Sequence, residues 1–198
     1  MNFIVDLPSS AGFDSILVVV DRLTKMAHFI TCNKSINAKQ TALLVLQEIV
    51  RLNGIPEEIV SDKGPQFTSY FWKHLFKLLG KKIKLSSAYH SQFNGQSKWV
   101  NQVLEQYLKC TVNYHQGNWA DLLPLAEFSY NNSTHSSTDT TLFFANYGFY
   151  PQFNIQSPKH SVVTSAENHA IHLQQIRVEL TKELEAARER YKQNADRL

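Results

Sequence analysis

The feature that most constrains the fold is a change in the spacing of apolar residues after about residue 37. Before it, three short apolar runs occupy residues 2–7, 15–21 and 25–31 and are separated by brief polar connections. They are rich in β-branched and aromatic side chains, which favours strands, and short connections favour antiparallel neighbours. From residue 38 onward apolar residues recur three or four positions apart, the period of a helix. We therefore expect a three-stranded meander followed by helices and further strands.

The middle of the chain predicts two helix–strand units. A helix over 38–53 ends at Gly54, and a strand follows over 57–62. A second helix over 68–80 leads to a fifth strand over 82–87. The apolar residues expected to face the core are Ala42, Leu46, Ile49 and Val50 in the first helix and Phe71, Leu75, Leu78 and Leu79 in the second.

The remaining third of the sequence predicts helices. A helix over 96–114 has an apolar face of Val100, Val103, Leu104, Tyr107 and Leu108, and shorter helices are expected over 118–131 and about 140–147. A long helix over about 165–195 has apolar residues at 173, 176, 180, 184, 187 and 191, a spacing that would let it pair with a partner. The expected fold is α/β, a five-stranded mixed sheet flanked by helices. The expected division is a core over 1–158 and a linker with a C-terminal helical arm over 159–198.

Composition excludes several classes of protein. At 198 residues and 43% hydrophobic, the chain can bury an ordinary core. Cys32 and Cys110 are the only cysteines, so we do not expect a disulfide framework. We expect the protein to reside in a reducing compartment. The apolar run at 16–20 is too short to cross a bilayer, and we expect no membrane partner. The net charge of +3 gives only a weak indication of nucleic-acid binding.

Asp62 is the candidate catalytic residue suggested by local pattern. It lies in "VSDKGPQFTS", where the fourth expected strand ends and a loop begins. Metal-dependent phosphoryl transfer uses carboxylates from separate elements to hold two divalent ions about 4 Å apart. Taken alone, an aspartate before a glycine turn is more often turn chemistry. Its partners would have to come from the first strand and from the start of the 96–114 helix.

Four stretches of the sequence carry a resemblance to a known family: "VVVDRLTKMAHFI", "VSDKGPQFTSYFW", "YHSQFNGQSKWVNQVLEQYL" and "LAEFSYNNSTHSST". Together they resemble the integrase catalytic core of Ty3/gypsy-type long-terminal-repeat retrotransposons, over roughly residues 1–158. The resemblance implies an RNase H-like fold and a polynucleotidyl transferase that cuts and joins DNA. It also implies Mg²⁺ or Mn²⁺ as cofactor, bound by an Asp, Asp, Glu triad in which 35 residues separate the last two members.

Two of the three triad positions do not carry the residue that the resemblance implies. Asn2 stands where the family has its first aspartate, and Asp62 matches the second. Lys98 follows Gly95-Gln96-Ser97 at the position of the glutamate, and residues 63–97 make up the 35 between them. The spacing is therefore intact although the side chains are not. We expect metal binding, retained by Asp62 alone, to be weak or lost, and the copy to be catalytically inactive.

DNA remains the expected partner. By resemblance, contacts to DNA would come from Tyr89, His90, Gln92, Asn94, Gln96 and Lys98. A homodimer formed through the core or the C-terminal helix is expected, with a nuclear or a shared nuclear and cytoplasmic location. Two alternatives stay open: a non-enzymatic module for nucleic-acid binding or assembly, and a retroelement remnant without a selected role.

Overall fold

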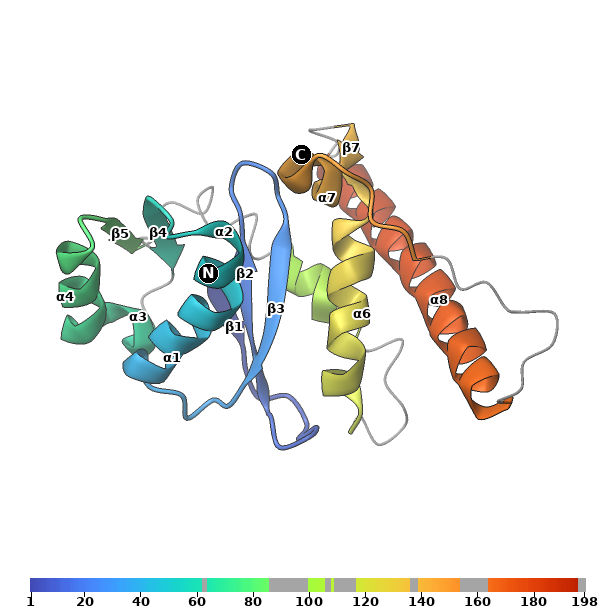
Figure 1. The fold of residues 1–198 in the computed structure, drawn as a ribbon, viewed down its shortest axis with the longest axis horizontal. Helices are drawn as coiled ribbons and strands as arrows, with labels where there is room; N and C mark the ends of the chain where they lie inside the picture. The colour runs from blue at the N-terminus through green and yellow to red at the C-terminus, as the bar shows by residue number, and fades with distance from the viewer. Residues whose placement is uncertain are drawn as a thin grey trace.

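The computed structural model describes residues 1–61, 64–85, 100–105, 108, 117–135, 139–153 and 164–195. Figure 1 shows a central sheet with helices on both sides. The predicted strands and helices appear in the predicted order within the described ranges, most with different bounds, and α3, β6 and β7 were not predicted. The strands are β1 (Asn2–Ile4), β2 (Ser15–Val20), β3 (Ala27–Cys32), β4 (Glu58–Ser61), β5 (Lys82–Leu85), β6 (Thr134–His135) and β7 (Thr140–Thr141). The helices are α1 (Ala38–Val45), η1 (Leu46–Val50), α2 (Arg51–Asn53), α3 (Pro65–Thr68), α4 (Tyr70–Leu78), α6 (Trp119–Asn131), α7 (Leu142–Tyr147) and α8 (Thr164–Ala195).

Strands β1, β2 and β3 form the predicted antiparallel meander. Asn2 lies opposite Val18, and Val18 lies opposite Phe29. Strands β4 and β5 pair in parallel as a second ladder. A hydrogen bond connects the two ladders, in which the Met1 ammonium group donates to the carbonyl of Val60 at 2.7 Å. The five expected strands are therefore present, hydrogen-bonded as three and two.

The core lies on both faces of the meander because successive residues of β2 point to opposite sides. Ile16 and Val18 pack against Val100, Val103, Leu104 and Leu108 and against residues of helices α6 and α8. Leu17 packs on the other face with residues of α1, η1, α3 and α4. From left to right, Figure 1 shows α4, α1, the sheet, α6 and α8 in succession.

The first helical segment bends where a π-helical turn, η1, separates α1 from α2. Asn37 begins it with a capping box, in which Asn37 and Gln40 exchange side-chain and backbone hydrogen bonds. Gly54 ends it at a φ of 77°, as predicted. The predicted stripe is wrong in part: Leu46 is 54% exposed, and the buried residues are Thr41, Val45 and Ile49. These three residues are spaced four apart, so they form one row along the helix, and this row faces the sheet.

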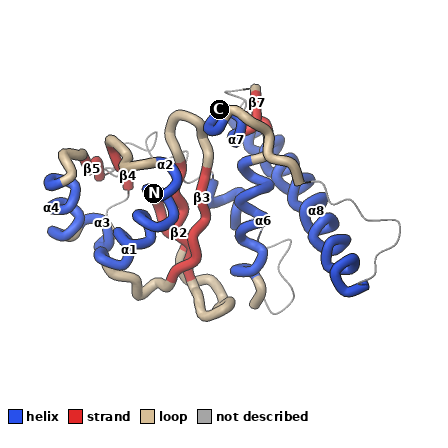
Figure 2. Tube along the Cα trace, in the orientation of Figure 1, coloured by secondary structure: helices blue, strands red, loops and turns tan. Residues whose placement is uncertain are grey.

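The predicted apolar face of the second helix is also wrong in part. Phe71 and Leu79 are exposed, whereas Trp72 and Phe76 are nearly fully buried. Their rings stack with centroids 5.3 Å apart. Both large aromatic side chains lie one turn apart and bury more apolar area than the leucines would, so they set which side of α4 faces the core. Figure 2 shows α3 and α4 as separate helical segments beyond β4.

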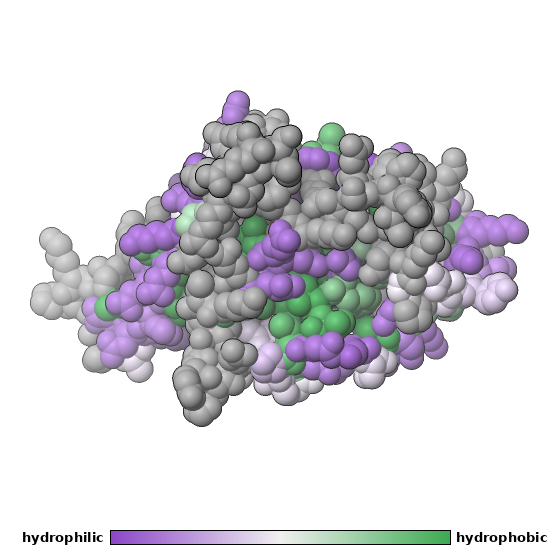
Figure 3. Space-filling model, turned by 180° about the vertical axis from the view of Figure 1, so that it is seen from behind, coloured by the Kyte–Doolittle hydropathy of each residue, from purple (hydrophilic) through white to green (hydrophobic). Residues whose placement is uncertain are grey.

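The long helix α8 packs partly against its own chain. Ile176 is buried, and Leu173 packs against the same cluster as α6. The first part of the predicted apolar stripe therefore contacts the core of the same molecule rather than a partner. Figure 3 shows the reverse face, where apolar surface near the middle is bordered by hydrophilic side chains. Among the helices described, none is long and apolar enough to cross a membrane.

Candidate functional site

Asn2 is the only predicted site residue that the structure describes. It lies on β1, partly exposed, and its Oδ1 accepts a hydrogen bond from the backbone N–H of Phe3 at 2.9 Å. Asp62, Lys98 and the predicted DNA contacts Tyr89, His90, Gln92, Asn94 and Gln96 all lie outside the described residues. Their assignments stay predictions.

The structure does bring the start of β1 next to the end of β4. The bond from Met1 to Val60 lies one residue before Asn2 and two residues before Asp62. Ser61, the last residue of β4, is fully buried, and its Oγ has no hydrogen-bond partner within the described part of the chain. An unpaired buried hydroxyl costs about 1–3 kcal/mol. The strand end that adjoins the candidate site thus carries a buried hydroxyl for which the described residues supply no partner.

The described donors do not fit a two-metal centre. No group of three or more His, Cys, Asp or Glu side chains within the described residues is placed to hold a metal ion. Asn2 contributes a neutral amide oxygen that already accepts the Phe3 N–H. Hard divalent cations require several anionic oxygen ligands, which this part of the chain does not supply.

Asp21 and Asp6, the nearby carboxylates that could compensate, are engaged elsewhere. Asp21 Oδ2 accepts from the Thr24 backbone N–H at 2.8 Å and from the Thr24 hydroxyl at 2.6 Å, which closes the β2–β3 turn. Burial raises the pKa of Asp21, but the hydrogen bonds from Thr24 outweigh it and leave the pKa below the usual 3.8. Asp6 pairs with Lys34 at 2.6 Å.

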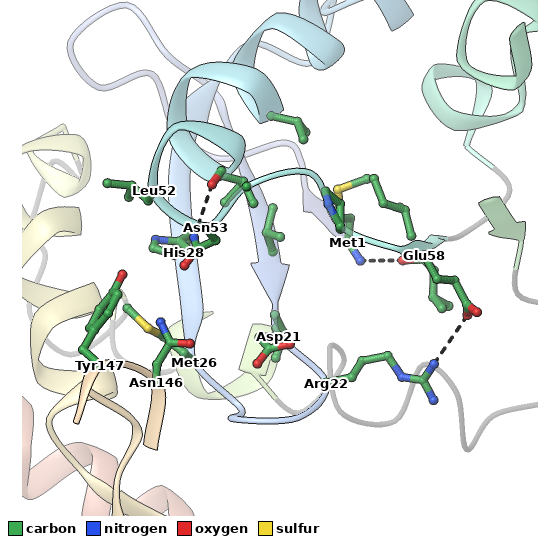
Figure 4. Close-up of a pocket in the computed structure, with 18 residues that line it drawn as sticks. Met1, Asp21, Arg22, Met26, His28, Leu52, Asn53, Glu58, Asn146 and Tyr147 are labelled. Atoms are coloured by element: carbon green, nitrogen blue, oxygen red, sulfur yellow. Dashed lines mark hydrogen bonds and ion pairs between the residues drawn. The ribbon is translucent and has the colours of Figure 1, made fainter. Parts of the chain in front are cut away.

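A cavity of about 560 Å³ lies beside the candidate site and was not predicted from the sequence. Figure 4 shows its labelled side chains converging from the ends of β2 and β3, from α2, from β4 and from α7. Three of its lining side chains have close partners: Arg22 lies 3.6 Å from Glu58, and His28 Nδ1 lies 3.0 Å from Glu127. No sequence pattern could have located it, because its lining comes from segments far apart in the chain.

Comparisons with known proteins were made for both sequence and structure. No family model matches the chain. The chain is 41% identical over 143 residues to the transposon Tf2-3 polyprotein of Schizosaccharomyces pombe, which covers 72% of this chain and 11% of that protein. The Tf2-4 polyprotein of the same organism matches to the same extent. The chain therefore spans about a ninth of the length of these relatives.

Solved structures show which fold the chain shares. The magnesium complex of the HTLV-2 integrase catalytic core domain, in its trimeric form, has a TM-score of 0.57 at 17% identity, covering 74% of this chain and 94% of that one. The BIV integrase catalytic core has a TM-score of 0.54 at 22% identity, with 74% and 93% covered. A simian T-cell lymphotropic virus intasome chain has a TM-score of 0.61 at 15% identity, with 82% and 59% covered.

Proposed function

We propose that this chain is a catalytically inactive, DNA-binding integrase core of the Ty3/gypsy type. The premise is that the chain shares the RNase H-like fold of solved integrase catalytic cores and is homologous to a segment of the Tf2 polyproteins. One observation carries the proposal. The distance from Asp62 to Lys98 keeps 35 intervening residues, yet Asn2 and Lys98 replace two of the three carboxylates.

Electrostatics supports the loss of catalysis. At about 4 Å and an effective dielectric constant near 20, a unit charge and a divalent ion interact by roughly 8 kcal/mol. A lysine at the glutamate position reverses the sign of that interaction. Asn2 keeps an oxygen but not its charge. A pocket with one remaining carboxylate would hold a divalent cation weakly, and the two-metal reaction needs two of them.

Calorimetric titration of Mg²⁺ and Mn²⁺ into the full chain tests the proposal without depending on turnover. We expect no saturable binding by the unmodified chain and clear binding after Asn2→Asp combined with Lys98→Glu. The single variant Lys98→Gln is the matched control, because it removes the positive charge without supplying a ligand. Saturable binding of two ions by the unmodified chain would contradict the proposal.

Cleavage and strand transfer on a labelled DNA duplex give the second readout. We expect no metal-dependent product from the unmodified chain. The double variant is expected to form product if this segment of the longer protein suffices for the reaction. Robust metal-dependent turnover by the unmodified chain would show that the site is active.

Partners and location follow from the same proposal. We infer a homodimer, supported by the exposed apolar residues Leu43, Leu46 and Leu52 along α1, η1 and α2, and by the HTLV-2 integrase core, which has also been solved in a dimeric form. We also infer a nuclear location, since chromosomal DNA is the proposed partner. Sedimentation over a dilution series tests the dimer, and a purely monomeric chain would contradict it. Imaging of a tagged chain tests the location, and exclusion from the nucleus would contradict it.

A further inference from the structure

The outer side of α4 carries a compact set of polar and aromatic side chains, which we call the α4 basic face: Tyr70, Lys73, His74 and Lys77. Their spacing of three, four and seven places them on one side of the helix. All four are exposed, and Tyr70 is 91% exposed. They lie opposite Trp72 and Phe76, which face the core.

The excess positive charge of the chain is concentrated in the segment that includes this face. Between Asp62 and Glu105 there are seven lysines and no acidic residue, so the rest of the chain holds 13 basic and 17 acidic side chains. The ion pairs found in the described part of the chain involve Arg22, His28, Lys34 and Arg51. Lys73 and Lys77 form none with described residues. Both side chains are exposed, so their ammonium groups can reach an anionic partner.

The geometry of the face suits a nucleic-acid strand. Lys73 and Lys77 are separated by about 6 Å along the helix axis, at 1.5 Å per residue. Phosphates of one DNA strand follow each other every 3.4 Å or so along the duplex axis, so these lysines can reach phosphates about two apart. Tyr70 lies one turn before them, and Lys73 Nζ lies 5.9 Å from the centre of its ring. An exposed aromatic ring beside lysines is the arrangement on which unpaired bases stack.

We propose that the α4 basic face contacts a DNA strand, with Lys73 and Lys77 on its phosphates and Tyr70 against an unpaired base. This deepens the proposed DNA-binding function and rests on it. Helix α4 follows closely after β4, whose last residue, Ser61, precedes Asp62. In Figure 1 the helix lies at the left end of the molecule, away from α6 and α8. DNA held here would approach the candidate site from that flank.

A salt series tests the lysine contacts. Affinity for a labelled oligonucleotide of mixed sequence, duplex or single-stranded, is measured by fluorescence anisotropy for the chain and for Lys73→Gln with Lys77→Gln. The slope of log affinity against log salt should fall in magnitude by about 1.8 on duplex DNA and about 1.4 on single strands, the values for two phosphate contacts. The matched control is Lys39→Gln with Lys182→Gln, which removes two exposed lysines from α1 and α8 and should leave the slope unchanged.

Substitution of Tyr70 tests the stacking contact. Tyr70→Ala should weaken binding to single strands by about tenfold, the order expected for loss of one stacked base. Binding to blunt duplex should not change. Tyr70→Phe keeps the ring and should behave as the unmodified chain. Because the residues of this face are exposed, circular dichroism should show the same fold in every variant.

The outcomes separate this inference from the function on which it rests. If the unmodified chain binds neither form of DNA, the DNA-binding function fails and this inference fails with it. If the unmodified chain binds DNA and the Lys73 and Lys77 variant keeps its slope, only the α4 inference fails. The same holds if the variant loses affinity for polyglutamate and not for DNA, because the face would then recognise acidic protein.

Discussion

Single side chains in this molecule show how one substitution can change chemistry while the backbone stays in place. Asn2 still pairs opposite Val18 in the sheet, as an aspartate there would. What differs is that an amide nitrogen replaces one carboxylate oxygen and the negative charge is lost, while the remaining oxygen accepts a hydrogen bond from the next backbone N–H. The proposed loss of metal binding is therefore a matter of side-chain charge and not of fold.

Cys32 gives a prediction at the residue scale. Burial at the end of β3 raises the pKa of its thiol from 9.0 to about 12. The thiolate is the reactive form, so native Cys32 should resist iodoacetamide at pH 8–9, where an unperturbed thiol with a pKa of about 8.5 ionises. Mass spectrometry of the Cys32 peptide should show slow alkylation in the native chain and rapid alkylation in urea. Equal rates in both states would contradict the burial.

The raised pKa also has a consequence for stability. The native thiol keeps its proton to higher pH than the unfolded one, so the native state binds more protons between these two pKa values. The contribution of Cys32 to stability is therefore fully present below pH 9 and declines as the pH rises toward 12. Cys32→Ala should show less of this decline.

At the scale of elements, α6 closes the outer edge of the meander. Asn131, fully buried, accepts from the Ala27 N–H at 2.9 Å and donates to the Ala27 carbonyl at 2.7 Å. Glu127, one turn earlier, accepts from the Phe29 N–H at 2.7 Å and contacts His28. Side chains of α6 thus form hydrogen bonds with backbone groups of β3 that another strand could otherwise pair with.

Asn131→Ala should remove this closure. Two buried backbone groups of Ala27 would lose their partners, each at about 1–3 kcal/mol, so the free energy of unfolding should fall by roughly 2–6 kcal/mol. Urea unfolding measures it, with Asn132→Ala, a partly exposed neighbour, as the matched control. Equal unfolding midpoints for the two variants would show that the hydrogen bonds to β3 contribute little.

At the scale of the whole molecule, α8 belongs to the packing of the core at least through its first turns. The predicted division into a core over 1–158 and an arm over 159–198 stays a prediction, but the contact of Ile176 with the α6 side of the core bears on it. Ile176→Ala should lower the free energy of unfolding by about 2–5 kcal/mol, the usual cost of truncating a buried isoleucine.

The same helix supplies a control for that measurement. Ile171 is 44% exposed, so Ile171→Ala should change stability by about 0.5 kcal/mol or less. If both substitutions had the same small effect, α8 would be an independent arm rather than part of the core.

Local pattern was enough to predict the order of the longer elements in this protein, but it did not predict α3, β6 or β7. β-branched runs, helical spacing and terminal glycines mark strands and helices through short-range preferences, and the Asp62-to-Lys98 register can be counted without coordinates. Local pattern was not enough to predict which side of a helix is buried. Leu46 and Phe71 were expected inside and are exposed, because the choice depended on Val45, Trp72 and the sheet that they meet.

The sequence by itself therefore determined the type and order of the elements and the identity of the residues at the catalytic positions. Tertiary structure alone decided that Asn131 and Glu127 close the edge of β3 and that a cavity opens among segments far apart in the chain. These features depend on contacts between residues distant in the chain. Such contacts form only when packing selects one arrangement among the many that local preferences allow.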